Sequence, residues 1–130
     1  MHRRNAYMTA IAALAGTAIA TGSAIAEDDL AAAKKLALNH CGVCHTFEAG
    51  EPARQGPNLH GVVGRVAGSA EGFVYSDGFR KGVGGKTWDP ALLDRWLTDP
   101  QSVAPGTVML YGQNDPEKRA LLIRFLESLQ

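Results

Sequence analysis

Apolar and small residues recur at helical spacing in three stretches of the chain, and each stretch predicts a helix. The first stretch runs from Leu30 to His40, where residues 30, 33, 34 and 37 share one face. The second begins at Asp89-Pro90, an N-cap residue followed by proline at the first helical position, and stops before Pro100. Its apolar stripe consists of Leu92, Leu93, Trp96 and Leu97.

The third helical stretch lies at the end of the chain. Asp115-Pro116 repeats the start signal of an N-cap residue followed by proline. The apolar positions after it stand at i, i+3, i+4 and i+7, and they are Leu122, Phe125, Leu126 and Leu129. The pattern therefore predicts an all-α domain with three main helices.

The segment between Gly42 and Gly85 has neither a helical stripe nor the alternation of a strand. It holds 11 of the 13 glycines that follow residue 26. An irregular loop of this length argues against a self-contained core in so small a domain, unless the loop wraps something. We expect long loops that wrap a bound group.

The first 26 residues have the order of parts of a secretory signal. Positive residues at 3 and 4 precede an uncharged, alanine-rich stretch over 6–20, and Ala24-Ile25-Ala26 forms an A-x-A cleavage site. We expect cleavage after Ala26, which leaves 27–130 as one exported, periplasmic domain. A retained membrane anchor is the alternative, but the apolar run is interrupted by polar residues and is short for a bilayer.

Charge and size restrict the function further. The whole chain has a formal net charge of zero and 45% apolar residues, which suits one compact domain. Residues 27–130 keep 11 Lys and Arg against 13 Asp and Glu, a net charge of −2, which excludes strong binding to nucleic acid. A domain of this size buries a modest core, so an apolar cofactor inside it would contribute to stability.

Cys41-Gly42-Val43-Cys44-His45 has the C-x-x-C-H spacing of c-type haem attachment. On a helical turn, residues at i, i+3 and i+4 face one side. Two thiols can then bond the porphyrin vinyl groups while the imidazole reaches iron, and Gly42 would keep the turn from crowding the ring. The motif predicts one covalently bound haem c.

Three other uses of the cysteine pair are open from sequence. A disulfide is usual in exported proteins, but a bond between Cys41 and Cys44 closes a tiny loop and constrains the unfolded chain little. A zinc site needs four ligands, and only His40 and His60 remain as comparable donors after the motif. A thioredoxin-like redox pair needs a βαβ setting, whereas this sequence predicts no strands. Haem attachment is therefore favoured.

The sixth position on iron separates an electron carrier from a haem protein that binds small ligands. Met109 is the only methionine after residue 26, and it ends a turn-prone segment over 105–109. A methionine that only fills a gap in the core is one alternative. His60 is the competing ligand, but it lies 15 residues after His45 in a glycine-bounded loop. Met109 is the predicted ligand.

The chain resembles the class I cytochromes c, close to the mitochondrial type and the related bacterial carriers. The resemblance covers essentially all of residues 27–130. It implies an all-α class I fold, with three main helices and long loops around one covalent haem c whose edge is exposed. The matching segments, in chain order, are Cys41-Gly42-Val43-Cys44-His45, Gly56-Pro57-Asn58-Leu59-His60-Gly61, Gly64-Arg65, Gly72-Phe73-Val74-Tyr75, Trp88, Pro105-Gly106-Thr107-Val108-Met109 and Leu122-Ile123-Arg124-Phe125-Leu126.

The resemblance also implies how iron is held. His45 is the proximal ligand and Met109 the distal one. The carbonyl of Pro57 accepts a hydrogen bond from the His45 ring, and such a bond fixes the orientation and basicity of an imidazole ligand. The last helix crosses the first, with Phe125 against the small residues near 33 and 37.

The same resemblance assigns residues to the haem propionates. Tyr75 and Trp88 donate hydrogen bonds to a propionate, and Arg65 stands near to offset its charge. Tyr and Trp each bury an apolar body and offer one donor, which suits a buried carboxylate. The alternative is that both are plain core aromatics.

The chain departs from the family pattern in the haem surroundings. Trp96 occupies a position where the family often has a tyrosine near the methionine sulfur, and Phe79 one where asparagine is frequent. Both changes bear on the reduction potential. The segment between Tyr75 and Trp88 is also two residues longer than in the mitochondrial type.

A further departure concerns the surface. Mitochondrial-type carriers ring the exposed haem edge with lysines, whereas the matching positions here hold His40, Gln101 and Val108. With a net charge of −2, electrostatic steering toward an acidic partner should be weak. The sequence predicts an apolar or differently charged docking surface.

These features predict an electron carrier, not an enzyme. We expect a monomeric periplasmic protein of a respiratory chain, which takes electrons from a membrane complex or dehydrogenase and passes them to an oxidase or reductase. One alternative is a dedicated subunit docked on one periplasmic dehydrogenase. The other is a haem enzyme or sensor with a labile sixth site, against which Met109 argues.

Overall fold

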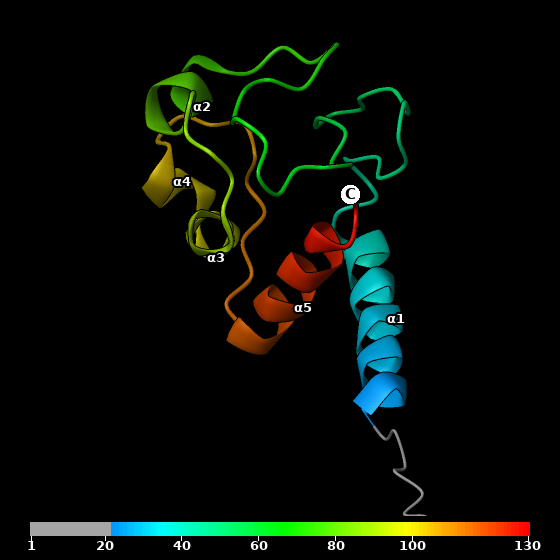
Figure 1. Ribbon diagram of the computed structural model, residues 1–130. Coiled ribbons are helices and arrows are strands. Elements are labelled where there is room, and N and C mark those ends of the chain that lie inside the picture. Colours follow the sequence, from blue (N-terminus) through cyan, green and yellow to red (C-terminus); the bar gives the residue numbers. More distant parts are fainter. Residues whose placement is uncertain (1–21) are drawn as a thin grey trace, which may run out of the picture.

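The computed structural model describes residues 22–130, with side chains from residue 27 onward. The predicted signal segment over 1–26 lies outside the described residues, apart from the backbone of 22–26. The described part contains five helices and one isolated antiparallel bridge between Val66 and Thr87 (Figure 1). In chain order the helices are α1 (Gly22–His40), α2 (Asp77–Gly82), α3 (Pro90–Thr98), α4 (Pro100–Val103) and α5 (Pro116–Glu127).

The first and last helices pack against each other (Figure 1). Ala33 and Ala37 on α1 are 0% and 1% exposed, and such small residues allow α5 to approach closely. Phe125 on α5 is buried in the same core, where its ring meets Phe47 edge-on with centroids 5.4 Å apart. The expected pairing of the terminal helices around small residues and Phe125 is therefore present.

Helix α1 begins earlier than predicted. The sequence pattern placed its start at Leu30, whereas the helix starts at Gly22. Residues 23–29 contain no proline or glycine, so nothing in them stops a helix. The acidic residues Asp28 and Asp29 consequently lie inside α1 and not at its end.

The starts of α3 and α5 agree with their sequence signals. The side chain of Asp89 accepts a hydrogen bond from Leu92 N at 2.7 Å, and that of Asp115 accepts one from Glu117 N at 2.9 Å. A proline follows each cap at the first helical position. The capped starts fix the helices that supply much of the core: Leu92, Leu93, Trp96 and Leu97 on α3, with Leu122, Ile123, Phe125 and Leu126 on α5.

Two short helices were not predicted. Helix α2 lies in the segment expected to be irregular, and α4 follows α3 after one residue. With six and four residues, they are too short to show a hydrophobic period. Both begin at a side-chain cap, Ser76 for α2 and Asp99 for α4.

The loop over 64–67 pairs with the segment over 85–88. Gly64 N donates to Trp88 O at 2.7 Å, and Trp88 N donates to Arg65 O at 2.9 Å. These bonds close the longer segment between Tyr75 and Trp88 and bring Arg65 beside Trp88. Among the described residues, no helix is long and apolar enough to cross a membrane.

Candidate functional site

A cavity of about 400 Å³ opens between the loops that follow α1 and the helices α3 and α5. This volume lies in the usual range for a site that binds a small molecule or cofactor. The lining is predominantly apolar. All eight residues predicted for the haem site line it: Cys41, Cys44, His45, Pro57, Arg65, Tyr75, Trp88 and Met109.

The motif residues continue α1 by one turn. Cys41 N donates to Ala37 O at 2.7 Å, and His45 N donates to Cys41 O at 2.9 Å. This turn places both thiols and the imidazole on the cavity side. The role expected for Gly42 was wrong, since a Cβ there would meet the carbonyl of Leu38, and Gly42 does not line the cavity.

Both motif cysteines are free thiols, so the structure contains no disulfide between them. Cys44 Sγ donates to Gln55 Oε1 at 3.2 Å. Burial, and to a lesser degree the neighbouring Cys44, raises the pKa of Cys41 to about 11. Cys41 is therefore a neutral thiol at physiological pH.

One ring nitrogen of His45 is hydrogen-bonded within the protein, and the other has its lone pair available to a metal. Nδ1 lies 2.8 Å from the carbonyl oxygen of Pro57. Because a carbonyl can only accept, Nδ1 carries the proton and Nε2 keeps its lone pair. Burial lowers the pKa of His45, which favours the neutral form that binds metals. A side chain at Gly56 would collide with this ring, so only glycine fits there.

Met109 also lines the cavity, and its sulfur has one hydrogen-bond partner. The indole Nε1 of Trp96 donates to Met109 Sδ at 3.2 Å. Trp96 therefore lies where the resemblance placed it, beside the methionine sulfur. His60 is absent from the cavity lining, so the structure does not bring the competing ligand to this site.

One corner of the cavity is polar. Of the Lys and Arg residues that the structure describes, only Arg65 lies in the lining, and its guanidinium donates to the carbonyls of His60 at 3.0 Å and Asn58 at 2.9 Å. Among the described residues, no Asp or Glu lines the cavity. A positive charge here, without an acidic partner in the lining, suits a carboxylate ligand.

Tyr75 and Trp88 stand in the same lining as Arg65. The hydroxyl of Tyr75 accepts from Ala70 N at 3.3 Å and keeps its own proton to donate. Burial raises the pKa of Tyr75, so the phenol stays protonated at neutral pH. The indole N–H of Trp88 has no protein partner among the described residues, although the side chain is buried. Both donors remain available to a ligand.

Aromatic rings form the wall behind this corner. Phe79 stacks on Tyr75 with centroids 4.5 Å apart and meets Trp96 edge-on at 5.5 Å. Trp88 and Trp96 also contact each other, with centroids at 5.4 Å. Phe79 and Trp96, the two departures from the family pattern, thus make this wall apolar.

The other uses of the cysteines find no support in the described residues. These residues include no group of three or more His, Cys, Asp or Glu side chains arranged to hold a metal ion. The part of the chain that the structure covers also lacks the βαβ unit of a thioredoxin-like pair, because its only β pairing is one isolated bridge.

Some lining residues were not predicted. Gln55 and Tyr111 carry no motif that singles them out, and they reach the cavity through loop geometry alone. Leu93, Leu97, Leu122 and Leu126 could have been found, because they belong to the apolar stripes of α3 and α5.

Known proteins resemble the chain over most of its length. No protein-family model matches it. Cytochrome c2 of Rhodopila globiformis is 43% identical over 98 residues, which cover 75% of this chain and 90% of the relative. Cytochrome c of Chlamydomonas reinhardtii is 40% identical over 100 residues, which cover 76% and 88%.

A solved structure agrees with these relatives. Cytochrome cH from Methylobacterium extorquens superposes with a TM-score of 0.68 at 42% identity, covering 77% of this chain and 98% of that one. Identity of this size over most of both chains, together with the helical fold and the cavity at the C-x-x-C-H turn, is decisive. The chain belongs to the class I cytochromes c, electron carriers with one covalently bound haem c per chain.

Proposed function

We propose that the chain carries single electrons through a haem c bound by Cys41 and Cys44 and ligated by His45 and Met109. The observation that carries the proposal is the placement of these four residues on one apolar cavity. The free Nε2 of His45 and the sulfur of Met109 are the two uncharged donors that such a site needs.

The residues of the cavity fit a haem c. The thiols of Cys41 and Cys44 stand three residues apart on one turn, and the His45 ring follows on the same face. The haem iron, when bound, supplies the one-electron chemistry. The protein holds both donors, keeps the lining dry and orients the His45 ring through Pro57.

Arg65, Tyr75 and Trp88 are proposed to hold the haem propionates. Among the described residues, Arg65 offers the only positive guanidinium or ammonium group in the lining, while Tyr75 and Trp88 offer one free donor each. A propionate placed among these groups would have hydrogen bonds and a neutralising charge, which a buried carboxylate requires.

Two hydrogen bonds are proposed to tune the reduction potential. The carbonyl of Pro57 makes the His45 ring a better electron donor, whereas the indole of Trp96 draws electron density from the Met109 sulfur. The aromatic wall formed by Phe79 and its neighbours excludes water. Neutral ligands in a dry pocket favour the ferrous state.

We further propose that residues 1–26 are removed and that the protein works in the periplasm as a monomer. The support is the signal pattern at the start of the chain and the haem c motif. Cleavage after Ala26 would leave Glu27, Asp28 and Asp29 in the first turn of α1. Negative residues are favourable there because they face the positive end of the helix dipole.

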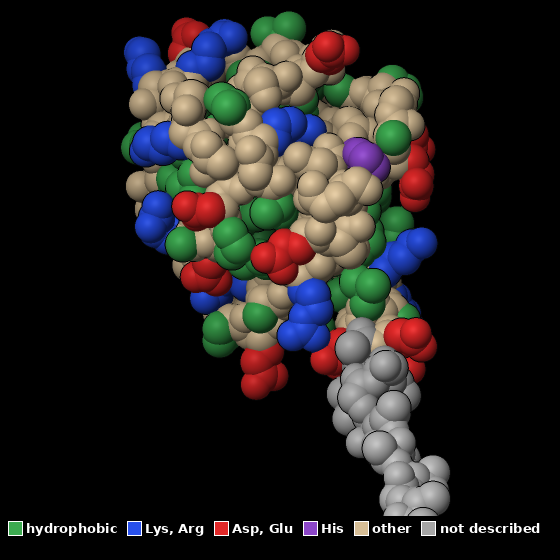
Figure 2. Space-filling model, in the orientation of Figure 1, with side chains coloured by type: hydrophobic (Ala, Val, Ile, Leu, Met, Phe, Trp, Pro, Cys, Tyr) green, Lys and Arg blue, Asp and Glu red, His purple; other side chains and the backbone are tan. Residues whose placement is uncertain are grey.

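The proposed partners dock on the rim of the cavity, which is apolar. Val108 and Leu110, which line the cavity, are 71% and 81% exposed, and Val43 in the motif turn is 74% exposed. On the face in Figure 2, side chains of both charges are interspersed with apolar ones. A partner with an apolar contact surface fits this rim, and its reaction rate should depend weakly on salt.

Replacement of Met109 tests the ligand assignment. Met109→Ala in the haem-loaded protein should keep the haem attached, lower the reduction potential and let the ferrous form bind carbon monoxide. The matched control is His60→Ala, which removes the competing donor and should leave the potential and the inertness to carbon monoxide unchanged. If His60→Ala opened the iron and Met109→Ala did not, the proposed ligation would be wrong.

A further inference from the structure

We propose that Gln101 and the pair formed by Tyr111 and His40 are positioning residues, which hold the segment over 105–111 and keep Met109 at the cavity. The inference rests on the proposed function, in which Met109 binds iron. His40 and Gln101 occupy two of the positions at which mitochondrial-type carriers have lysines around the haem edge. The inference gives these two residues a structural role.

The segment that carries Met109 is weakly attached through its own backbone. Between Ala104 and Asp115 the chain forms neither helix nor strand. Backbone hydrogen bonds tie Thr107 N to Ala104 O at 3.0 Å and Gln113 N to Leu97 O at 2.7 Å. Among the described residues, 108–112 take part in no backbone-to-backbone hydrogen bond.

Packing adds little on either side of the methionine. Val108 and Leu110, its two neighbours, are both largely exposed. Thr107 is buried, and Met109 and Tyr111 pack partly against the core, but a segment with so few backbone bonds opens at a low free energy unless side-chain bonds hold it. The placement of Met109 therefore depends on side-chain bonds in addition to this partial packing.

Gln101 supplies three of these bonds from α4. Its Nε2 donates to Thr107 O at 2.7 Å and to Met109 O at 3.3 Å, while its Oε1 accepts from Gly106 N at 3.2 Å. Only an amide offers donors and an acceptor in this arrangement. Pro100, the preceding residue, is fully buried, so Gln101 is attached to a fixed part of the core. We call the hydrogen bonds of Gln101, and those of Tyr111 with His40, the two braces of the methionine segment.

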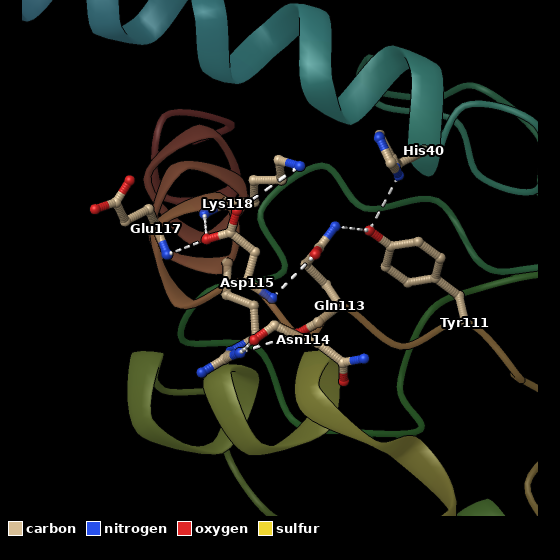
Figure 3. A network of polar contacts seen from close by, with 8 residues as sticks. His40, Tyr111, Gln113, Asn114, Asp115, Glu117 and Lys118 are labelled. Atoms are coloured by element: carbon tan, nitrogen blue, oxygen red, sulfur yellow. Dashed lines mark hydrogen bonds and ion pairs between the residues drawn. The ribbon is translucent and has the colours of Figure 1, made fainter.

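The other end of the segment is tied to α1. Tyr111 Oη lies 3.3 Å from Nδ1 of His40, and the two rings meet edge-on with centroids 5.8 Å apart (Figure 3). Gln113 Nε2 donates to the same hydroxyl at 3.3 Å. Because the hydroxyl accepts from Gln113, its own proton is free to go to His40 Nδ1.

His40 connects the methionine segment to the helix that precedes the haem-attachment motif. His40 is the last residue of α1 and directly precedes Cys41. The contact with Tyr111 thus links the helix that carries the haem-attachment motif to the segment that carries the methionine. Figure 3 shows Tyr111 reaching the end of α1 and the hydrogen bonds continuing through Gln113 to Asp115 at the start of α5.

The test uses imidazole as a probe of opening in the ferric, haem-loaded protein. Imidazole can bind iron only after Met109 leaves, so its apparent affinity reports how often the segment opens. Gln101→Ala should tighten imidazole binding about tenfold or more, because hydrogen bonds to three backbone groups are lost. Tyr111→Phe removes only the hydroxyl and should tighten binding about fivefold.

A stability control and a double variant test whether the effect is specific to the methionine segment. Ile123→Val lowers global stability from a buried position on α5 that does not line the cavity, and it should leave imidazole affinity unchanged. Gln101→Ala combined with Tyr111→Phe should give about the product of the single effects, since the two braces share no partner. The far-red methionine-to-iron absorption band should also disappear at a lower temperature than global unfolding in both single variants.

The outcomes separate this inference from the proposed function. If wild-type protein has the far-red band and both variants bind imidazole within twofold of wild type, the brace is wrong and Met109 ligation stands. The brace is equally wrong if Ile123→Val tightens binding as much as Gln101→Ala does. If wild-type protein lacks the band and binds imidazole freely, Met109 is not a ligand, and the proposed function fails together with the inference.

Discussion

The two sides of the cavity are built in different ways. His45 lies five residues after the end of the 19-residue helix α1, and helical hydrogen bonds continue through the motif turn between them. The loop that carries Pro57 is fixed by its neighbour Asn58, whose amide donates to Thr46 Oγ1 at 3.0 Å and to Glu48 O at 2.8 Å. Met109, in contrast, lies in a segment without regular structure.

The difference predicts that His45 stays bound to iron, whereas Met109 can dissociate when its segment opens. The His45 side is fixed by backbone geometry, and in the proposed function also by the covalent bonds of Cys41 and Cys44. The Met109 side depends on single side-chain bonds, from Trp96 and Gln101 above all. Substitutions on the first side should therefore affect global folding, while those on the second should affect closure of the iron site.

The largest expected effect is on the helix pair that supports the His45 side. Leu122 on α5 is 1% exposed in the core. Leu122→Ala should lower the free energy of unfolding by about 3–4 kcal/mol, through lost burial and the cavity left behind. Urea unfolding of the haem-loaded protein measures this loss. A parallel gain of a hundredfold or more in imidazole affinity would show that the two sides are not independent.

The next effect concerns the His45 ring itself. Gly56→Ala places a methyl group against this ring and should cost about 2–3 kcal/mol of stability through overpacking. The ring must turn away from Pro57, so the ferric absorption spectrum should change as well. Gly64→Ala is the matched control, because Gly64 has φ +85 and open space around it. It should lose stability through backbone strain and keep the wild-type spectrum.

A smaller effect is expected at the Met109 sulfur. Trp96→Phe removes the N–H donor at 3.2 Å and should weaken closure of the site by about 1 kcal/mol. Imidazole affinity should rise about fivefold, and the reduction potential should fall, because the methionine ligation that favours the ferrous state is weakened. If both the potential and the imidazole affinity were unchanged, the hydrogen bond from Trp96 would not influence ligation by Met109.

The smallest effect is expected from the ion pair between the terminal helices. Arg124 Nη1 lies 2.8 Å from Asp29 Oδ2, and both side chains are about half exposed. Solvent screening limits such a pair, so Arg124→Ala should cost about 0.5 kcal/mol of stability at low salt and less at high salt. Chemical denaturation at two salt concentrations measures this. A loss of several kcal/mol would mean that Arg124 does more than pair with Asp29.

The sequence predicted most of what local physics controls. The caps at Asp89 and Asp115 marked the starts of α3 and α5 because a side-chain acceptor followed by proline is a short-range signal. The spacing of Cys41, Cys44 and His45 placed three side chains on one face for the same reason. Short helices such as α2 were missed because a hydrophobic period needs more residues than they contain.

The rest depends on contacts between distant parts of the chain. His40 and Tyr111 are 71 residues apart, and no local pattern indicates that they meet. The sequence singled out Gln101 only as a position without lysine, and its bonds to the methionine segment exist only once α4 and that segment are folded. The crowding at Gly42 was assigned to the wrong neighbour because backbone approach within one turn is invisible in sequence.

The most direct test of the central claim is the ferric absorption spectrum of the haem-loaded protein, followed by exposure of the ferrous form to carbon monoxide. If His45 and Met109 close the iron site, the ferric protein has the weak far-red methionine-to-iron band and the ferrous protein does not bind carbon monoxide. Absence of the band together with rapid carbon monoxide binding would contradict the claim and identify an open haem site.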